Sequence, residues 1–128
     1  IMKIIGIGVD IIENRRIKSS IKNKKFVSRI FSKNEILDLK KKSNKTNYLS
    51  KRFAAKEALA KAIGTGFRDG LNFKDIEVVN NKHGKPYYII SSKIKNFIKK
   101  KRKIKSFNLF LSISDEKEYS VAFAMIQT

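Results

Sequence analysis

The sequence predicts a single α+β domain over residues 1–128, built from an antiparallel sheet packed against helices. Three observations support this class. Apolar runs of strand length lie near both ends of the chain. Between them, a long alanine-rich segment carries apolar residues at helical spacing. The length of 128 residues allows one modest core and excludes two-domain enzymes and long repeat arrays.

The chain starts with a segment that is typical of a buried strand. Residues 3–9 form an apolar run, and its glycines, Gly6 and Gly8, would allow another backbone to approach closely. Asp10 follows directly, so we expect this carboxylate at the end of the strand.

Three or four helices are expected next. From residue 13 to residue 42 apolar side chains recur at helical spacing, and Ser32 with Glu35 forms a capping box that starts a separate helix. The clearest helix covers residues 47–63, and Gly64 is placed to end it in a left-handed conformation.

The remaining chain is expected to contain two hairpins separated by a basic helix that Ser92 caps. The hairpin turns are rich in asparagine, glycine and acidic residues, which favour tight turns. The expected elements are strands over residues 75–79 and 86–90, a helix over residues 92–102, and strands over residues 107–114 and 119–126.

The chain is strongly basic, with 30 Lys and Arg residues against 11 Asp and Glu residues and a formal net charge of +19. Such a charge first suggests a polyanionic partner such as nucleic acid. Codon drift toward A and T can explain part of it, because 24 of the basic residues are lysine and both Ile and Asn are abundant. The excess is +13 over residues 14–56 and +8 over residues 93–105, and the sequence assigns no function to the second stretch.

Composition excludes several kinds of site. The chain has no cysteine, which excludes disulfides, thiolate metal sites and thiol nucleophiles. Its one histidine, His83, lies in an expected turn, so Ser–His catalysis lacks a general base. No apolar run is long enough to cross a bilayer and no signal peptide precedes the first strand, so we expect a cytoplasmic protein. Ile1 precedes Met2, and one interpretation of this order is that Ile1 is a leftover of expression.

Two carboxylates are the best candidates for chemistry. Asp10 ends the glycine-containing strand, and Glu57 lies in the long helix among small alanines that let a ligand approach. Oxygen ligands of this kind suit Mg²⁺ or a similar hard cation. The alternative from the pattern alone is that Asp10 begins a helix and that Glu57 pairs with Lys61 one turn later.

Cations surround Glu57 in the sequence. Arg52, Lys56 and Lys61 lie on the same helix, and Gly64-Thr65-Gly66 follows its end. Two carboxylates that hold a divalent cation among basic groups would suit a diphosphate substrate, because the cation and the basic groups neutralise phosphate charge. The Gly-Thr-Gly segment is not a Walker loop and, by itself, is interpreted as a helix cap.

These residues belong to segments that resemble the holo-[acyl-carrier-protein] synthase family, from the first strand to the last. The most specific segment is Arg52-Phe53-Ala54-Ala55-Lys56-Glu57-Ala58, which continues through Lys61-Ala62-Ile63 to Gly64-Thr65-Gly66. The other matching segments, in order, are Gly6-Ile7-Gly8-Val9-Asp10-Ile11 with Glu13 and Arg16, then Gly84-Lys85-Pro86, then Leu111-Ser112-Ile113-Ser114-Asp115.

The resemblance implies a magnesium-dependent 4′-phosphopantetheinyl transferase that uses coenzyme A (CoA) and supports fatty acid biosynthesis. In that reaction a serine hydroxyl of an apo acyl carrier protein attacks the β-phosphorus of CoA, phosphopantetheine moves to the serine, and adenosine 3′,5′-bisphosphate leaves. The resemblance places Mg²⁺ on Asp10 and Glu57 and makes both residues catalytic, with Glu57 removing the serine proton directly or through a metal-bound water. Such chemistry depends on positioning and charge neutralisation more than on a protein nucleophile.

The resemblance also assigns binding residues and partners. CoA is expected to contact residues of the long helix and of a later segment, namely Arg52, Lys56, Lys61, Gly64, Thr65, Lys85 and Pro86. The acidic carrier protein is expected on the basic surface that follows the first strand, formed by Arg16, Lys22, Lys25, Phe26 and Arg29. Family members are typically homotrimers with active sites between neighbouring subunits. Neither nucleic acid nor a membrane is an expected partner.

One position departs from the family pattern. Phe110 replaces a histidine that often helps to bind the nucleotide end of CoA, which removes a polar contact worth about 1 kcal/mol. We expect Phe110 in the core, with stacking on the nucleotide as the alternative.

Two other functions remain as alternatives. A nucleic-acid-binding protein would explain the charge alone, and a carrier-binding module without catalysis would explain Phe110 but not Asp10 and Glu57.

Overall fold

The computed structural model describes residues 2–67 and 70–128, and Ile1 lies outside the described part. Its elements alternate between helices and strands much as the sequence predicts. In chain order they are β1 (Ile4–Glu13), α1 (Asn14–Ser20), α2 (Lys24–Ile30), α3 (Lys33–Leu39), α4 (Lys45–Ile63), the short 3₁₀ helix η1 (Phe73–Asp75), β2 (Ile76–Asn80), β3 (Pro86–Ile90), α5 (Ser92–Arg102), β4 (Asn108–Asp115) and β5 (Tyr119–Gln127).

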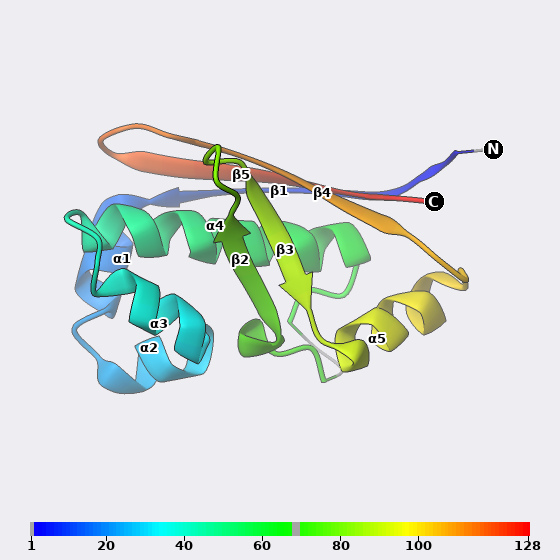
Figure 1. The fold of residues 1–128 in the computed structure, drawn as a ribbon, viewed down its shortest axis with the longest axis horizontal. Helices are drawn as coiled ribbons and strands as arrows, with labels where there is room; N and C mark the ends of the chain where they lie inside the picture. The colour runs from blue at the N-terminus through cyan, green and yellow to red at the C-terminus, as the bar shows by residue number, and fades with distance from the viewer. Residues whose placement is uncertain (1, 68–69) are drawn as a thin grey trace.

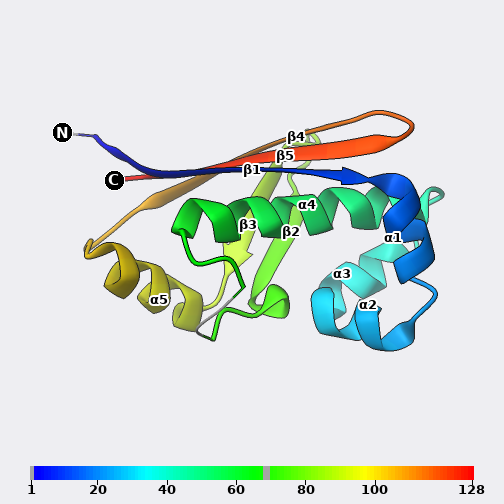
Figure 2. The ribbon, with the colours of Figure 1, turned by 180° about the vertical axis from the view of Figure 1, so that it is seen from behind.

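A three-stranded antiparallel sheet forms one layer of the fold, which confirms the predicted α+β class. β5 lies in its centre, with β1 on one side and β4 on the other, so the two ends of the chain meet in adjacent strands. α4 runs along one face of this sheet, and the β2–β3 hairpin crosses in front of α4 (Figure 1). Seen from behind, α1, α2 and α3 lie beside the start of α4 and α5 lies beside its end (Figure 2).

Gly6 and Gly8 bring β1 directly against α4. A Cβ atom at Gly6 would overlap the carbonyl oxygen of Ala62, and one at Gly8 would overlap the carbonyl oxygen of Ala58. Because the helix presents only alanines here, the two backbones lie closer than larger side chains would allow. The contact confirms the predicted close approach and places Asp10, two residues after Gly8, next to α4.

Both ends of α4 are capped by the residues around them. The side chain of Asn44 accepts a hydrogen bond from the backbone N–H of Asn47 at 3.0 Å, so the helix starts at Lys45 rather than at residue 47. At the other end Gly64 adopts the predicted left-handed conformation, with φ of +96°. The apolar side chains between these caps are buried against the sheet and form the middle of the core.

The three helices before α4 are short, with seven residues each. Isolated helices of this length are unstable in water, so their positions depend on tertiary contacts. The capping box predicted at the start of α3 is present: the Ser32 hydroxyl accepts the N–H of Glu35, and the Glu35 carboxylate accepts the N–H of Ser32.

The first strand extends past its predicted end. β1 continues to Glu13 and pairs with β5 along this extension, so Asp10 lies inside the strand, opposite Ala122. This placement rules out the alternative in which Asp10 begins a helix. A smaller correction concerns α5, which is capped by Ser91 rather than by Ser92, its first residue.

The face of the sheet that points away from α4 is apolar and exposed. Both views show no described element above it (Figures 1 and 2). Phe110 is 43% exposed on this face, so its predicted place in the core is wrong. The face carries exposed apolar residues from all three strands, namely Ile7, Val9, Ile11, Phe110, Tyr119 and Phe123.

None of the helices in the described ranges is both long enough and apolar enough to span a membrane.

Candidate active site

Asp10 and Glu57 are brought together by the contact between β1 and α4. Asp10 is on the strand face that meets the helix, and its side chain is 17% exposed. Glu57 is half-buried and precedes Ala58, the helix residue that Gly8 contacts. Glycine on the strand and alanine on the helix therefore leave room for two carboxylates at one point of the β1–α4 boundary.

Lys61 is bound to this pair through Asp10. Its ammonium donates to Asp10 Oδ1 at 3.1 Å and to the carbonyl oxygen of Val9 at 3.0 Å. The pattern-based alternative paired Lys61 with Glu57 one turn earlier, and the structure shows the ion pair with Asp10 instead. Lys61 keeps about half of its side chain exposed, so its charge is accessible from solvent.

The environment of Glu57 favours a nearby cation. Burial raises the pKa of Glu57, the negative charge of Asp10 raises it further, and Lys61 opposes both effects. Mg²⁺ commonly binds one or two protein carboxylates and completes its shell with water and phosphate oxygens. In the part of the chain that the structure describes, no cluster of three or more His, Cys, Asp or Glu side chains forms a complete protein cage. The two carboxylates of Asp10 and Glu57 fit Mg²⁺ in this way.

The end of α4 lies about one turn beyond Lys61. Gly64 is exposed there, and the half-buried Thr65 donates its hydroxyl hydrogen to the carbonyl oxygen of Gly66 at 2.8 Å. Arg102 of α5 reaches the same end of the helix, where its guanidinium donates to the carbonyl oxygens of Ile63 and Ile5. Arg102 therefore joins α5 to β1 and α4, a structural function for one residue of the basic stretch 93–105.

Arg52 lies on a different side of α4. Five residues before Glu57, it is about 140° away around the helix. Its side chain is buried, with Nη2 donating to Asn80 Oδ1 at 2.7 Å and the guanidinium stacked 3.8 Å from the centre of the Tyr48 ring. Its Nε has no hydrogen-bond partner among the described residues.

A cavity of about 370 Å³ opens in front of Arg52, between the start of α4 and the β2–β3 turn. Asn80 lines it and connects its two sides, because its amide also donates to the carbonyl oxygen of Gly84 at 2.9 Å. Lys85 and Pro86 follow this turn, Lys85 being exposed and Pro86 half-buried. The structure thus groups Arg52 with the Gly84-Lys85-Pro86 segment and separates this group from the two carboxylates.

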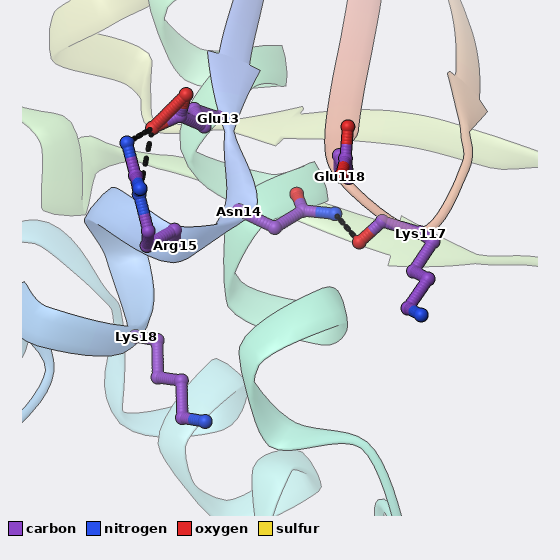
Figure 3. Close-up of a pocket in the computed structure, with 6 residues that line it drawn as sticks. All are labelled: Glu13, Asn14, Arg15, Lys18, Lys117 and Glu118. Atoms are coloured by element: carbon purple, nitrogen blue, oxygen red, sulfur yellow. Dashed lines mark hydrogen bonds and ion pairs between the residues drawn. The ribbon is translucent and has the colours of Figure 1, made fainter.

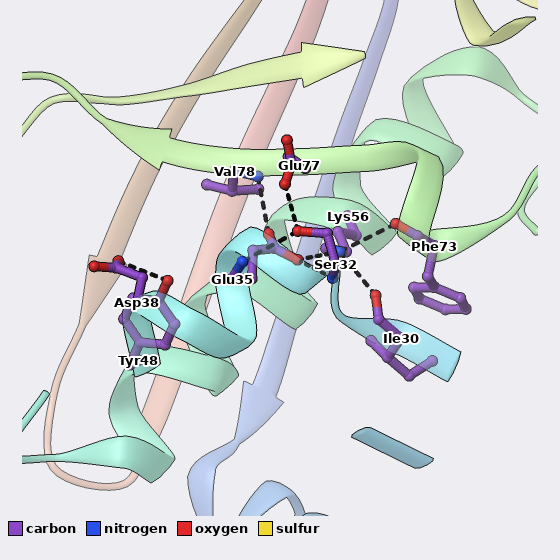
Figure 4. A network of polar contacts seen from close by, with 9 residues as sticks. All are labelled: Ile30, Ser32, Glu35, Asp38, Tyr48, Lys56, Phe73, Glu77 and Val78. Carbon is purple, nitrogen blue, oxygen red and sulfur yellow. Dashed lines mark hydrogen bonds and ion pairs between the residues drawn. The ribbon is translucent and has the colours of Figure 1, made fainter. Parts of the chain in front are cut away.

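Lys56 lies neither beside the Asp10–Glu57 pair nor at the Arg52 cavity. Its side chain is fully buried, and its ammonium donates to Glu35 Oε1 at 2.7 Å and to the carbonyl oxygens of Ile30 and Phe73 at 2.8 and 3.0 Å (Figure 4). Burial lowers the pKa of Lys56, and Glu35 opposes that shift. Because all three N–H groups have protein acceptors, none is left for CoA. The geometry contradicts the predicted contact between Lys56 and CoA.

The predicted carrier surface is exposed on α1, α2 and the turn between them. Its four cations, Arg16, Lys22, Lys25 and Arg29, are all exposed, and Phe26 is half-buried beside them. None of these cations forms an ion pair with a described residue. The surface has the free positive charge and the partly accessible apolar side chain that an acidic partner would require.

The start of α1 is held by the turn between β4 and β5. Asn14 is buried, and its amide nitrogen donates to the carbonyl oxygens of Glu116 and Lys117, both at 3.1 Å. Figure 3 shows the bond to Lys117. Its amide oxygen accepts the Ser120 hydroxyl at 2.8 Å. Asn14 thus fixes the point where β1, which carries Asp10, passes into the helices of the carrier surface.

Sequence reasoning missed Asn14, Tyr48 and Asn80. Each acts through partners that are distant in the chain, so no local motif marks it. Asn80 had one usable signal, since it begins the turn that leads to Gly84, but nothing in the sequence connects it to Arg52.

Comparisons with known proteins add a family context. The profile of the 4′-phosphopantetheinyl transferase superfamily matches residues 6–124. A holo-[acyl-carrier-protein] synthase of Pelagibacter ubique is 63% identical over 126 residues, which cover 98% of this chain and 98% of the relative.

Solved structures agree in fold. The crystal structure of a holo-[acyl-carrier-protein] synthase from Neisseria meningitidis superposes with a TM-score of 0.87 and 36% identity, covering 97% of this chain and 98% of the other. A second structure, from Bacillus anthracis in complex with CoA (3′,5′-ADP), superposes with a TM-score of 0.82 and 38% identity, covering 100% and 99% of the two chains.

Proposed function

This chain belongs to the 4′-phosphopantetheinyl transferase superfamily, and from that membership we propose how its residues carry out the transfer. It is an enzyme of the holo-[acyl-carrier-protein] synthase type, which transfers phosphopantetheine from CoA to acyl carrier protein and supports fatty acid biosynthesis. The observation that carries the proposed site is the Asp10–Glu57 carboxylate pair with Lys61 beside it.

Asp10 and Glu57 would hold Mg²⁺ at the β1–α4 contact. When bound, the ion would supply positive charge that neutralises the phosphates of CoA during transfer. Burial and the negative charge of Asp10 raise the pKa of Glu57, and a cation bound between the two carboxylates would offset both effects, which supports this assignment. CoA is the co-substrate, and the related Bacillus anthracis structure in complex with CoA (3′,5′-ADP) supports its binding here.

Lys61 and Glu57 act on the reacting groups. The ammonium of Lys61 is anchored at Asp10 and still accessible, so it can donate to a phosphate oxygen of CoA. Glu57 accepts the proton of the carrier serine, directly or through water. Gly64 and Thr65, at the end of the same helix, would contact CoA beside Lys61.

Arg52 and the Gly84-Lys85-Pro86 segment would bind the nucleotide end of CoA. Arg52 supplies a fixed cation at its cavity, and Lys85 and Pro86 lie after the turn that Asn80 joins to it. The acidic carrier would dock on the surface formed by Arg16, Lys22, Lys25, Phe26 and Arg29, because opposite charges steer and orient such partners.

A homotrimer would cover the exposed sheet face. Monomers rarely leave a contiguous apolar surface of this kind in water. In such an assembly the active site would lie between neighbouring subunits, with the carboxylates of one subunit facing the Arg52 cavity of the next. The separation of these two groups around α4 supports this arrangement.

Mass spectrometry of an apo acyl carrier protein tests the function directly. Incubation with this protein, CoA and Mg²⁺ should add one phosphopantetheine to the carrier, and Glu57→Ala should abolish the gain. The surface substitution Lys74→Gln, on an exposed side chain of η1, is the control and should leave the gain intact. If several bacterial carriers show no gain with the unmodified protein, the function is wrong.

The metal assignment has a readout apart from activity. Mg²⁺ at ten times its dissociation constant should stabilise the protein by about 1.4 kcal/mol, seen as a rise in Tm. Asp10→Asn and Glu57→Gln should remove this rise. A rise that persists in both variants would place the ion elsewhere.

A further inference from the structure

A buried ion pair lies next to Glu57 and touches no substrate. The side chains of Lys56 and Glu35 are 0% and 1% exposed, and their charged atoms are 2.7 Å apart. Burying two charges costs free energy, and well-packed apolar residues of similar volume commonly stabilise a core equally well. Stability alone is therefore a weak explanation for this pair.

The pair connects several elements at one point. Besides Glu35 of α3, the Lys56 ammonium binds the carbonyl oxygen of Ile30, the last residue of α2, and that of Phe73 in η1. The other oxygen of Glu35 accepts the backbone N–H of Val78 in β2 at 2.9 Å. Figure 4 shows the Glu35 and Lys56 side chains at the centre of this network, between Ile30, Phe73 and Val78.

This network joins the carrier surface to the catalytic helix. Lys56 immediately precedes Glu57 on α4, and Ile30 immediately follows Arg29 of the carrier surface. α2 has seven residues and cannot hold its own position, so a hydrogen bond at its last residue limits how it can rotate or slide. The Lys56 side chain thus couples the orientation of α2 to the position of Glu57 on α4.

We propose that Glu35 and Lys56 are a positioning pair, which holds α2 and α3 against α4 so that a docked carrier presents its serine to Glu57. The proposal rests on the carrier surface assigned under the proposed function. The pair acts through α2 and Glu57, since neither charged group is accessible to CoA or to the carrier.

The test uses the double variant Glu35→Gln with Lys56→Met, in the full-length protein. It removes both charges together, so that no unpaired charge is left buried, and the new amide at position 35 retains an acceptor for the N–H of Ser32 or Val78. We expect a folded protein whose KM for the carrier rises about tenfold, because α2 is no longer held at one angle. CoA binding, titrated directly, should stay within about twofold of wild type, because no CoA contact is removed.

The matched control is Lys74→Gln, which removes one charge next to Phe73 without touching the network. Its KM for the carrier should equal that of the wild type. A folded double variant with wild-type KM for the carrier, or with an equal loss of CoA binding, would overturn the proposal.

Ser32→Ala keeps the proposal testable if the double variant does not fold. It removes the hydroxyl that accepts the N–H of Glu35 and donates to the Glu77 carboxylate, and it leaves both charges of the pair in place. The cap is partly exposed and its loss should be tolerated, while the KM for the carrier should rise about threefold. An unchanged KM in folded Ser32→Ala would equally count against the positioning role.

Arg29→Glu, measured in the same assay, separates this proposal from the docking assignment. If Arg29→Glu raises the KM for the carrier and the double variant does not, only the positioning role is wrong. If Arg29→Glu has no effect, the carrier surface itself is wrong, and the positioning role is rejected with it.

Discussion

Three lysine and arginine side chains of α4 carry the same charge and end in different environments. Lys61 stays accessible at Asp10, Arg52 lines a cavity, and Lys56 is fully buried against Glu35. Helix geometry separates Lys61 from Arg52, because a spacing of nine residues corresponds to about 180° around the helix. Arg52 and Lys56 lie near the same face and differ in what packs against them, since Arg52 reaches Asn80 of β2 and Lys56 reaches Glu35 of α3. At the residue scale, spacing indicates which side chains share a helix face, and burial decides which of them can reach a substrate.

Glu57→Gln should lower the transfer activity and raise the stability of the protein. Its raised folded-state pKa means that the ionised form is disfavoured by folding, so the native state loses stability as pH rises from the ordinary glutamate range through the raised pKa. Glu57→Gln removes this loss, and we expect Tm to increase by about 2 °C at pH 8 in metal-free buffer and to match the wild type in acid. Transfer activity should fall by a factor of about 10² to 10⁴.

Calorimetry at both pH values, with the mass assay for activity, checks this prediction. A Glu57→Gln variant that is less stable than the wild type at pH 8 would contradict the destabilisation of ionised Glu57 by burial and by Asp10. The conservative change Lys33→Gln, on an exposed side chain of α3, serves as the control for the loss of one titratable charge.

At the scale of elements, the contact between β1 and α4 determines the geometry of the site. Glycine on the strand and alanine on the helix allow the backbones to approach, and Asp10 and Glu57 follow from that approach. The short helices α1 and α2 are positioned by what they contact, through Asn14 at one end and Lys56 at the other.

Gly8→Ala should disrupt the β1–α4 contact. The new methyl group would overlap the carbonyl oxygen of Ala58, which is backbone and cannot move aside, so the loss of stability should be about 3 kcal/mol or more. Gly66→Ala is the matched control: it has open space around it and a φ of +62°, so it should lose only about 1 to 2 kcal/mol from backbone strain. Chemical denaturation measures both, and equal losses would argue against the steric explanation.

Charge reversal on α1 and α2 should act on the carrier alone. Arg16→Glu with Arg29→Glu replaces attraction by repulsion at two exposed positions, so the KM for an acidic carrier should rise at least about tenfold at low salt. The effect should shrink as salt is added, because exposed charges are screened. CoA affinity, measured by titration, should not change; a parallel loss of CoA affinity would refute the docking surface.

At the scale of the whole molecule, the exposed sheet face and the divided site point to the same assembly. The apolar face lies opposite α4, and the two groups of site residues lie on different sides of that helix. The large positive charge is distributed between the proposed carrier surface, a few cations proposed to bind CoA, Arg102 with a structural function, and exposed lysines of α5 without an assigned function.

Subunit mixing tests the assembly and the site together. Phe123→Asp, at the centre of the exposed face, should reduce the mass in light scattering from that of a trimer to 14.8 kDa and should reduce activity. Inactive Glu57→Ala and Arg52→Ala subunits, refolded together in equal amounts, should regain roughly a quarter of wild-type activity if each site uses both subunits. No recovery in trimers shown to be mixed would place the complete site within one subunit.

Local signals in the sequence were sufficient for much of the fold and for the centre of the site. The capping box at Ser32, the left-handed Gly64, the hairpins and the glycines of the first strand each depend on neighbouring residues, so they could be predicted without a partner element. Resemblance over the segments around Asp10 and Glu57 was enough to indicate the function, which the family match and the relatives then supported.

Burial and partners were decided only by the tertiary structure. Lys56 looks like a phosphate ligand in its motif, yet it is enclosed by Ile30, Glu35 and Phe73, which come from three other segments. Phe110 looks like a core residue on a strand, yet it points away from α4 because strand side chains alternate between faces. Whether a side chain is enclosed or accessible depends on what packs opposite it, and those elements are far away in the chain.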